Sequence, residues 1–170
     1  MTCSGRRVVL VVAALLGAAR IEARQFDADA IVQFQRAADG YAFQHRQVQR
    51  RLGANPGRGE MTAAMRDARV SAVDGDLFTP PVAFALRARI AAARGSGCAV
   101  PITGASNEVP RANQEASATV PVPACIAAVL PRLPEELEYR IAAVALLLVD
   151  THANMVVDVL HGAFAGGATP

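Results

Sequence analysis

The longest regular pattern in the chain is a helical stripe between Asp27 and Leu52. Positions on this stripe alternate in spacing between three and four residues, and they are Ile31, Phe34, Ala38, Tyr41, His45, Val48 and Leu52. Such spacing places side chains on one face of an α-helix, close to a heptad seam. Asp27 or Asp29 suits the start of the helix, and the glycine-rich segment 53–59 ends it. We therefore predict a helix over 27–52 whose seam packs inside the domain or forms a homodimer.

Two shorter helical patterns follow this stripe. The weaker one covers residues 61–73, and its apolar side carries Met61, Met65, Ala68 and Ala72. The stronger one begins after Thr79, which suits an N-cap, and has Pro80 in its first turn. It extends to about Arg94 and repeats apolar residues at a spacing of four, namely Val82, Leu86 and Ile90. The sequence thus predicts a helical part over 27–94.

Residues 95–123 have no sustained period. Proline prevents a regular helix in this stretch, at Pro101, Pro110, Pro121 and Pro123. We predict a surface loop here. One or two helical turns over 124–130 then open a C-terminal part over 124–162.

The C-terminal part changes to a period of two. Residues 136–141 alternate strictly between polar and apolar, which is typical of a strand with one wet and one buried face. Residues 146–149 form a short apolar run, and 155–160 form another that Asp158 interrupts. These runs predict a three-stranded antiparallel meander packed on about three N-terminal helices, which is an α+β fold. The alternative is one helix over 135–149, and the strict alternation favours the strands.

The N-terminus has the layout of a secretory signal. Arg6 and Arg7 precede an apolar run over 8–19, and small residues follow it at the expected cleavage position. The run is shorter than the roughly 20 residues that cross a bilayer. We predict a signal peptide over 1–23, cut after Ala23 or after Ala19, and a single domain over 24–170 without a transmembrane segment. The alternatives are an uncleaved anchor and a buried core helix. Cleavage implies a periplasmic or secreted protein.

Charge and cysteine content both change once this leader is removed. The whole chain has 17 basic and 15 acidic residues, and the leader holds three arginines and one glutamate, which leaves 14 of each. A balanced domain lacks the basic footprint of a nucleic-acid-binding protein. Cys98 and Cys125 remain, and in an oxidising compartment they are expected to pair. That bond closes a loop of 27 residues and contributes about 3 kcal/mol. A redox or metal-binding pair is the alternative.

Several segments resemble a group of small exported bacterial proteins that has no assigned activity. The resemblance lies in 75–80 (GDLFTP), 133–140 (LPEELEYR), 147–154 (LLVDTHAN) and 31–45 with its Tyr-x-x-x-His. It implies export and a C-terminal meander, and it supplies no reaction. More loosely, the tail resembles small periplasmic proteins, some of which are linked to metal homeostasis.

The chain departs from the tails of that group at one place. Such tails usually have a glycine-containing turn between the first two strands, whereas this chain has Ala-Ala-Val-Ala over 142–145. Alanine and valine are poor at the positive φ that tight hairpin turns need. This departure favours the helix alternative for that part of the chain.

The densest group of candidate ligands comprises Asp150, His152, Asp158 and His161. Imidazole and carboxylate suit divalent transition metals, so these four residues are a candidate metal site. Their spacing matches no established site, and Asp150 also suits a turn. His45 is a further candidate ligand, although a single histidine on an apolar stripe is usually a core residue.

Catalytic patterns are missing from the sequence. Glu136 and Glu138 alternate with apolar residues as a solvated strand face requires, and they do not form the opposed pair of a glycosidase. No serine lies in a nucleophile elbow, and no glycine-rich loop fits a phosphate or dinucleotide. We therefore predict no enzyme activity and no cofactor. The expected function is a non-enzymatic binding or interaction module with a protein partner or a second copy, and the alternative is a periplasmic metal-handling protein.

Overall fold

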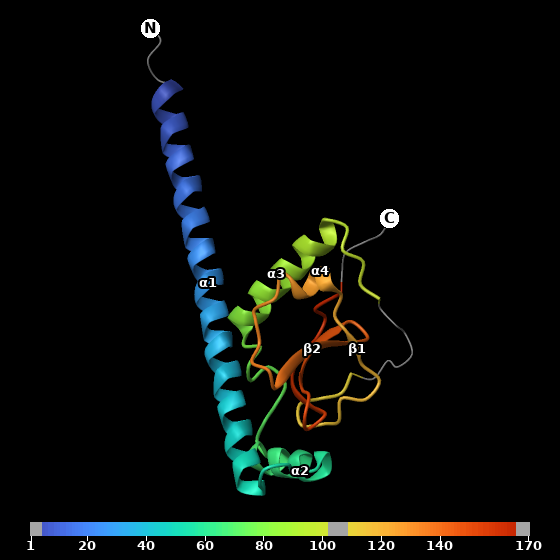
Figure 1. Cartoon of the computed structure of the whole chain (residues 1–170). Helices are drawn as coiled ribbons and strands as arrows, with labels where there is room; N and C mark the ends of the chain where they lie inside the picture. Colours follow the sequence, from blue (N-terminus) through green and yellow to red (C-terminus); the bar gives the residue numbers. More distant parts are fainter. Residues whose placement is uncertain (1–4, 102–108, 166–170) are drawn as a thin grey trace.

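The computed structural model describes residues 5–101 and 109–165, and their side chains from residue 25 onward. Helices occupy the N-terminal half and an antiparallel sheet occupies the C-terminal part, so the predicted α+β class is confirmed (Figure 1). The elements are α1 (Gly5–Leu52), α2 (Arg58–Ala68), α3 (Pro80–Gly95), β1 (Val120–Pro121), α4 (Ala124–Ala127), β2 (Leu137–Ala142), β3 (Ala145–Asp150) and β4 (Met155–Leu160).

Helix α1 is much longer than predicted, because it begins at Gly5 and not at Asp27. Residues between these two positions are mostly good helix formers, and no proline interrupts them. The N-terminal half of α1 extends beyond the other elements in Figure 1, and its C-terminal half packs against α3 and α2. Phe34 of α1 also stacks on Tyr139 of β2. The predicted cleavage after Ala23 falls inside this helix and stays a prediction. Among the described residues, no helix combines the length and the apolar character needed to span a membrane.

The seam of α1 packs into the domain's own core, as the first of the two predicted alternatives has it. Phe34, Tyr41 and Val48 are buried, and the Phe34 ring stacks on Phe78 with centroids 5.6 Å apart. Leu52 departs from the expected pattern, since 42% of it is exposed.

Helix α2 begins three residues earlier and ends five residues earlier than the predicted 61–73. The Glu60 carboxylate accepts the Gly57 N–H at 3.1 Å and fixes the early start. At the other end Arg69 leaves the helix, and its guanidinium donates to the Val157 carbonyl at 3.0 Å. Helix α3 matches its prediction to within one residue, although the Thr79 hydroxyl makes no capping bond.

The predicted meander is confirmed, and the alternative helix over 135–149 is wrong. Strands pair in the order β1-β2-β3-β4, all antiparallel. The first hairpin turns without a glycine, and Ala143 adopts a φ of +48°. That conformation costs an alanine about 1 kcal/mol. The six paired positions of each flanking strand, most of them buried, offset the cost.

The segment over 95–123 is a surface loop as predicted, since nearly all of its described residues are partly or fully exposed, and its later part also covers the sheet. Residues 95–101 and 109–123 of it are described, and 102–108 lie outside the described residues. Gln114 accepts a backbone bond from Val156 on the free edge of β4, and β1 pairs with β2 on the opposite edge. Between these edges Ala116 packs on the sheet face that the helices leave uncovered. Strands β3 and β4 are therefore buried on both faces, and each sheet edge is paired over part of its length.

The predicted disulfide is present. Cys98 follows α3 and Cys125 lies in α4, with their Cα atoms 5.9 Å apart. The bond fastens the end of α3 to α4.

Candidate functional site

Asp158, one of the four predicted metal ligands, is fully buried and fully bonded. Its Oδ1 accepts the N–H groups of Gly75 at 2.5 Å and Val159 at 2.7 Å. Its Oδ2 accepts those of Leu77 at 2.7 Å and Phe78 at 2.6 Å. Burial raises the pKa of Asp158, and these four backbone bonds lower it in part. The carboxylate therefore holds the loop over 75–78 at the entrance to α3.

His161 lies beside this same loop. Its Nε2 is 3.0 Å from Oδ2 of Asp74, and 56% of its side chain is exposed. The other Asp74 oxygen accepts the N–H of Ala112 at 2.7 Å. The structure thus divides the four candidate ligands into two pairs: Asp158 and His161 lie around the 74–78 loop, while Asp150 and His152 lie at the β3–β4 turn.

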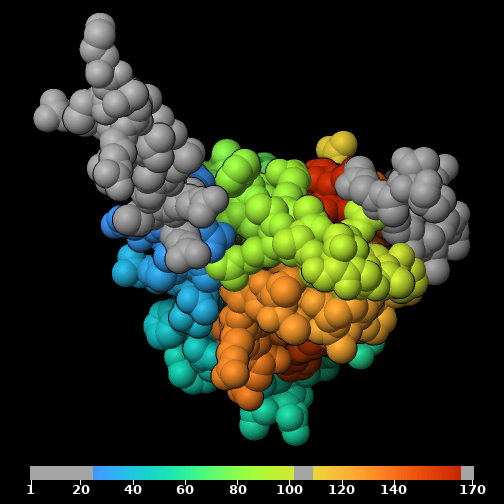
Figure 2. All heavy atoms as spheres, turned by 90° about the horizontal axis from the view of Figure 1, so that it is seen from above, coloured from blue at the N-terminus to red at the C-terminus, as the bar shows by residue number. Residues whose placement is uncertain are grey.

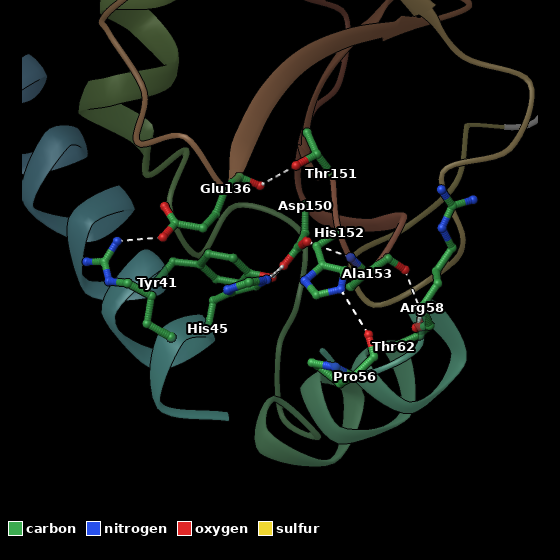
Figure 3. A network of polar contacts seen from close by, with 11 residues as sticks. Tyr41, His45, Pro56, Arg58, Thr62, Glu136, Asp150, Thr151, His152 and Ala153 are labelled. Atoms are coloured by element: carbon green, nitrogen blue, oxygen red, sulfur yellow. Dashed lines mark hydrogen bonds and ion pairs between the residues drawn. The ribbon is translucent and has the colours of Figure 1, made fainter. Parts of the chain in front are cut away.

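The second pair meets the helical seam in a buried polar cluster of Tyr41, His45, Asp150 and His152 (Figure 3). Tyr41 and His45 are one turn apart on α1, so both point toward the end of β3. The Tyr41 hydroxyl donates to Oδ2 of Asp150 at 2.7 Å, and the Ala153 N–H donates to Oδ1 at 2.7 Å. Burial, and then the charge of Asp150, raise the pKa of Tyr41, so this residue stays a hydroxyl donor.

His45 is the unusual member of this cluster. It is 2% exposed, and neither ring nitrogen has a hydrogen-bond partner among the residues that the structure describes. Its Nε2 lies 3.5 Å from Oδ2 of Asp150, which is within ion-pair distance but makes no hydrogen bond. Its ring centroid is 5.6 Å from that of His152, whose Nε2 lies 3.3 Å from the Pro56 carbonyl. Buried polar groups are almost always bonded, so this histidine requires an explanation.

Charged groups surround the cluster. Oε1 of the buried Glu136 accepts a bond from Arg46 at 2.5 Å, whereas its Oε2 has no partner within the described part of the chain. The Arg69 guanidinium carbon lies 5.1 Å from the centroid of the Tyr41 ring. The charges of Asp150, Glu136 and Arg69 therefore all act on Tyr41 in this cluster. Within 5–101 and 109–165, no three His, Cys, Asp or Glu side chains are already gathered as a metal centre.

A separate feature is a groove of about 630 Å³ between the end of α3 and α4. Its lining is mostly apolar and includes the disulfide, and it comprises Arg89, Ala92, Ala93, Ser96, Gly97, Cys98, Ala99, Cys125 and Val129. Figure 2 shows α3 and the segment containing α4 side by side on the face seen from above. Farther along α3, the exposed Phe84 ring packs edge-on against Phe26 of α1, with centroids 6.3 Å apart.

Sequence reasoning missed the partners of both aspartates and the groove. The Tyr-x-x-x-His spacing could have indicated that Tyr41 and His45 share a helix face, which is what brings both to Asp150. Nothing in the sequence identified Arg69 or the bonding of Asp158 to a loop about 80 residues earlier. The groove depends on how α3 and α4 are placed, which local patterns do not predict.

Comparison of the chain with known protein families, with curated proteins and with solved structures gives no match. The function is therefore inferred from the site geometry alone.

Proposed function

We propose that this chain is an exported, non-enzymatic interaction module that binds an apolar segment of a protein partner in the groove between α3 and α4. The observation that carries this proposal is the groove itself, whose volume of about 630 Å³ is within the range of functional pockets. Alanine, valine and the disulfide supply most of its lining, so it suits aliphatic or aromatic side chains.

The charge of the groove also favours an apolar occupant. Arg89 is the charged residue of the lining, and its guanidinium binds the Asp27 carboxylate at 2.6 and 3.3 Å. A neutralised guanidinium offers little attraction to a phosphate or a carboxylate. The balanced charge of the domain without its leader likewise disfavours a nucleic acid partner.

The exposed aromatic pair extends this surface along α3. Phe84 is 68% exposed and Phe26 is 50% exposed. Phe84, Ala88 and Ala92 follow one another at a spacing of four, so they share the face of α3 that leads to the groove. Large exposed aromatic residues beside an apolar groove are typical of binding surfaces, where they act as anchors.

Two further observations support the non-enzymatic and exported parts of the proposal. Asp158 directs all its acceptor capacity to backbone groups, as a structural carboxylate does. The disulfide between Cys98 and Cys125 is typical of an oxidising compartment such as the periplasm or the cell exterior.

Site-specific photocrosslinking in the native host tests the proposal. A photoreactive residue is placed at Phe84, at Ala92, or at the exposed Ala68 of α2 as a matched control. We expect the same partner protein to crosslink from positions 84 and 92 and not from 68. Adding Ala92→Asp should abolish the crosslink from 84 while leaving the melting temperature unchanged. Equal labelling from 68, labelling that Ala92→Asp does not reduce, or crosslinks solely to a second copy would contradict the proposal.

A further inference from the structure

The unbonded His45 lies beside groups that are arranged as metal ligands usually are. It is 2% exposed, and no hydrogen bond to either ring nitrogen is found among the described residues. A buried imidazole without a donor or acceptor is destabilising unless a water or an ion binds it. The unpartnered nitrogens therefore point to a ligand of the cluster.

The separation of His45 and Asp150 matches that of two ligands on one metal ion. Zinc binds nitrogen at about 2.0–2.1 Å and carboxylate oxygen at about 2.0–2.2 Å, so two tetrahedral ligand atoms lie about 3.3–3.5 Å apart. Nε2 of His45 and Oδ2 of Asp150 are 3.5 Å apart. That distance is too long for a good hydrogen bond and suits a shared cation.

The contacts around these side chains are those that orient metal ligands. Metal-bound histidines usually donate their second ring N–H to a carbonyl or carboxylate, and ligating carboxylates are themselves hydrogen-bonded. Nε2 of His152 lies 3.3 Å from the Pro56 carbonyl, which leaves its Nδ1 as the ligand atom. Asp150 accepts bonds from Tyr41 and from the Ala153 N–H, and it retains further lone pairs.

We propose that His45, Asp150 and His152 bind one divalent transition-metal ion of the Zn²⁺ type. His45 and Asp150 are in place, while His152 must shift, because no three such side chains already converge within the described residues. A water completes the coordination. Two imidazoles and a carboxylate favour Zn²⁺ or Co²⁺ over Mg²⁺ and Ca²⁺, which prefer oxygen ligands. The site differs from the groove, so it does not depend on the proposed function.

The three histidines of the chain supply the test and its control. The full-length chain is purified without a histidine tag and treated with a chelator, and Zn²⁺ alone is then titrated in a calorimeter. We expect one ion per chain and a higher melting temperature. Loss of an outer-shell partner weakens metal binding about 10–100-fold, so His152→Ala should weaken it by more than about 100-fold. His161→Ala is the matched control and should bind Zn²⁺ as the wild type does.

His45→Gln is the second variant, and circular dichroism checks that it and His152→Ala keep the native spectrum. Bound Co²⁺ should show the visible absorption of a tetrahedral nitrogen–oxygen site, and Mg²⁺ should leave the melting temperature unchanged. The proposal fails if Zn²⁺ does not bind to the wild type, if His152→Ala binds it as tightly, or if His161→Ala abolishes binding.

Discussion

Asp158 and Asp150 are both fully buried carboxylates on the sheet, and their surroundings differ sharply. Asp158 accepts four backbone N–H groups, so each of its oxygens has two donors. Asp150 accepts one backbone N–H and one hydroxyl, and it faces the unbonded Nε2 of His45 at 3.5 Å. Backbone donors fill every acceptor position of Asp158. Asp150 retains acceptor capacity beside His45, whose ring nitrogens make no hydrogen bond to the described residues.

This difference separates a structural role from a ligand-binding role. A buried carboxylate whose every lone pair is satisfied by backbone stabilises one conformation of a loop, here 75–78. A buried group left unsatisfied destabilises the fold, and such sites are common where function requires them. The comparison predicts that substitutions near Asp158 lower stability, while substitutions of His45 alter ligand binding and leave stability nearly unchanged.

Removing the charge of Asp158 should have the largest effect. In Asp158→Asn an NH₂ group faces two backbone N–H donors, so two bonds to a charged acceptor are lost. We expect a loss of about 3–4 kcal/mol in the free energy of unfolding, measured by urea denaturation at pH 7. Asp76→Asn in the same loop is the control and should cost less than about 1 kcal/mol, since Asp76 is exposed. Equal losses in the two variants would contradict the structural role assigned to the four backbone bonds of Asp158.

Removing the Tyr41 hydroxyl should have an intermediate effect. Tyr41→Phe deletes a bond to a charged acceptor, so we expect a loss of about 1.5–2 kcal/mol by urea denaturation. Tyr139→Phe is the matched control, because its hydroxyl donates at 3.2 Å to the neutral Pro131 carbonyl. That loss should be about 1 kcal/mol or less. An equal loss in Tyr139→Phe would show that the bond from Tyr41 to the charged Asp150 stabilises the fold no more than a bond to a neutral carbonyl does.

Replacing His45 should have a small effect on stability. His45→Leu removes two ring nitrogens that make no hydrogen bond to the described residues and keeps an apolar side chain on the seam. We expect the free energy of unfolding without metal to change by less than about 1 kcal/mol. Thermal denaturation after chelator treatment measures it. A loss above 3 kcal/mol would mean that His45 is a bonded structural residue. Asp150 would then have a structural role like that of Asp158.

Titration of Asp158 should make a smaller contribution, which is a change in the free energy of unfolding with pH. Burial raises its pKa above the usual 3.8, so the folded protein keeps this proton to a higher pH than the unfolded chain does. This carboxyl therefore makes the free energy of unfolding fall as pH rises from 3.8 through the folded pKa. Urea denaturation between pH 4 and pH 7 should show that contribution in the wild type and not in Asp158→Asn. The same slope in both would assign the effect to other groups.

Local sequence patterns predicted the elements whose structure depends on residues close together in the chain. The strict alternation over 136–141 identified β2, although Glu136 on the predicted solvated face is buried. The proline at the start of α3 fixed that helix to within one residue. The cysteine pair followed from counting the two thiols that lie outside the predicted leader. Each of these predictions rests on residues close together in sequence or on a count.

Tertiary contacts decided what the sequence could not show. Residues 109–121 lack periodicity because they cover the sheet as irregular backbone, bonding both of its edges. Asp158 looked like a ligand because its donors come from a loop about 80 residues away. The hairpin at Ala143 formed despite an unfavourable turn residue, since its strands pair along their full length. Local propensity is a weak guide where such distant contacts dominate.

Nitrogen-15 NMR of the histidine rings gives the most direct test of metal binding by His45, Asp150 and His152. The chain has three histidines, so their ring signals are resolved and assigned with single variants. On adding one equivalent of Zn²⁺ at pH 7.5, we predict large shifts for a nitrogen of His45 and a nitrogen of His152, and none for His161. Unchanged signals from His45 and His152, or shifts confined to His161, would contradict the account.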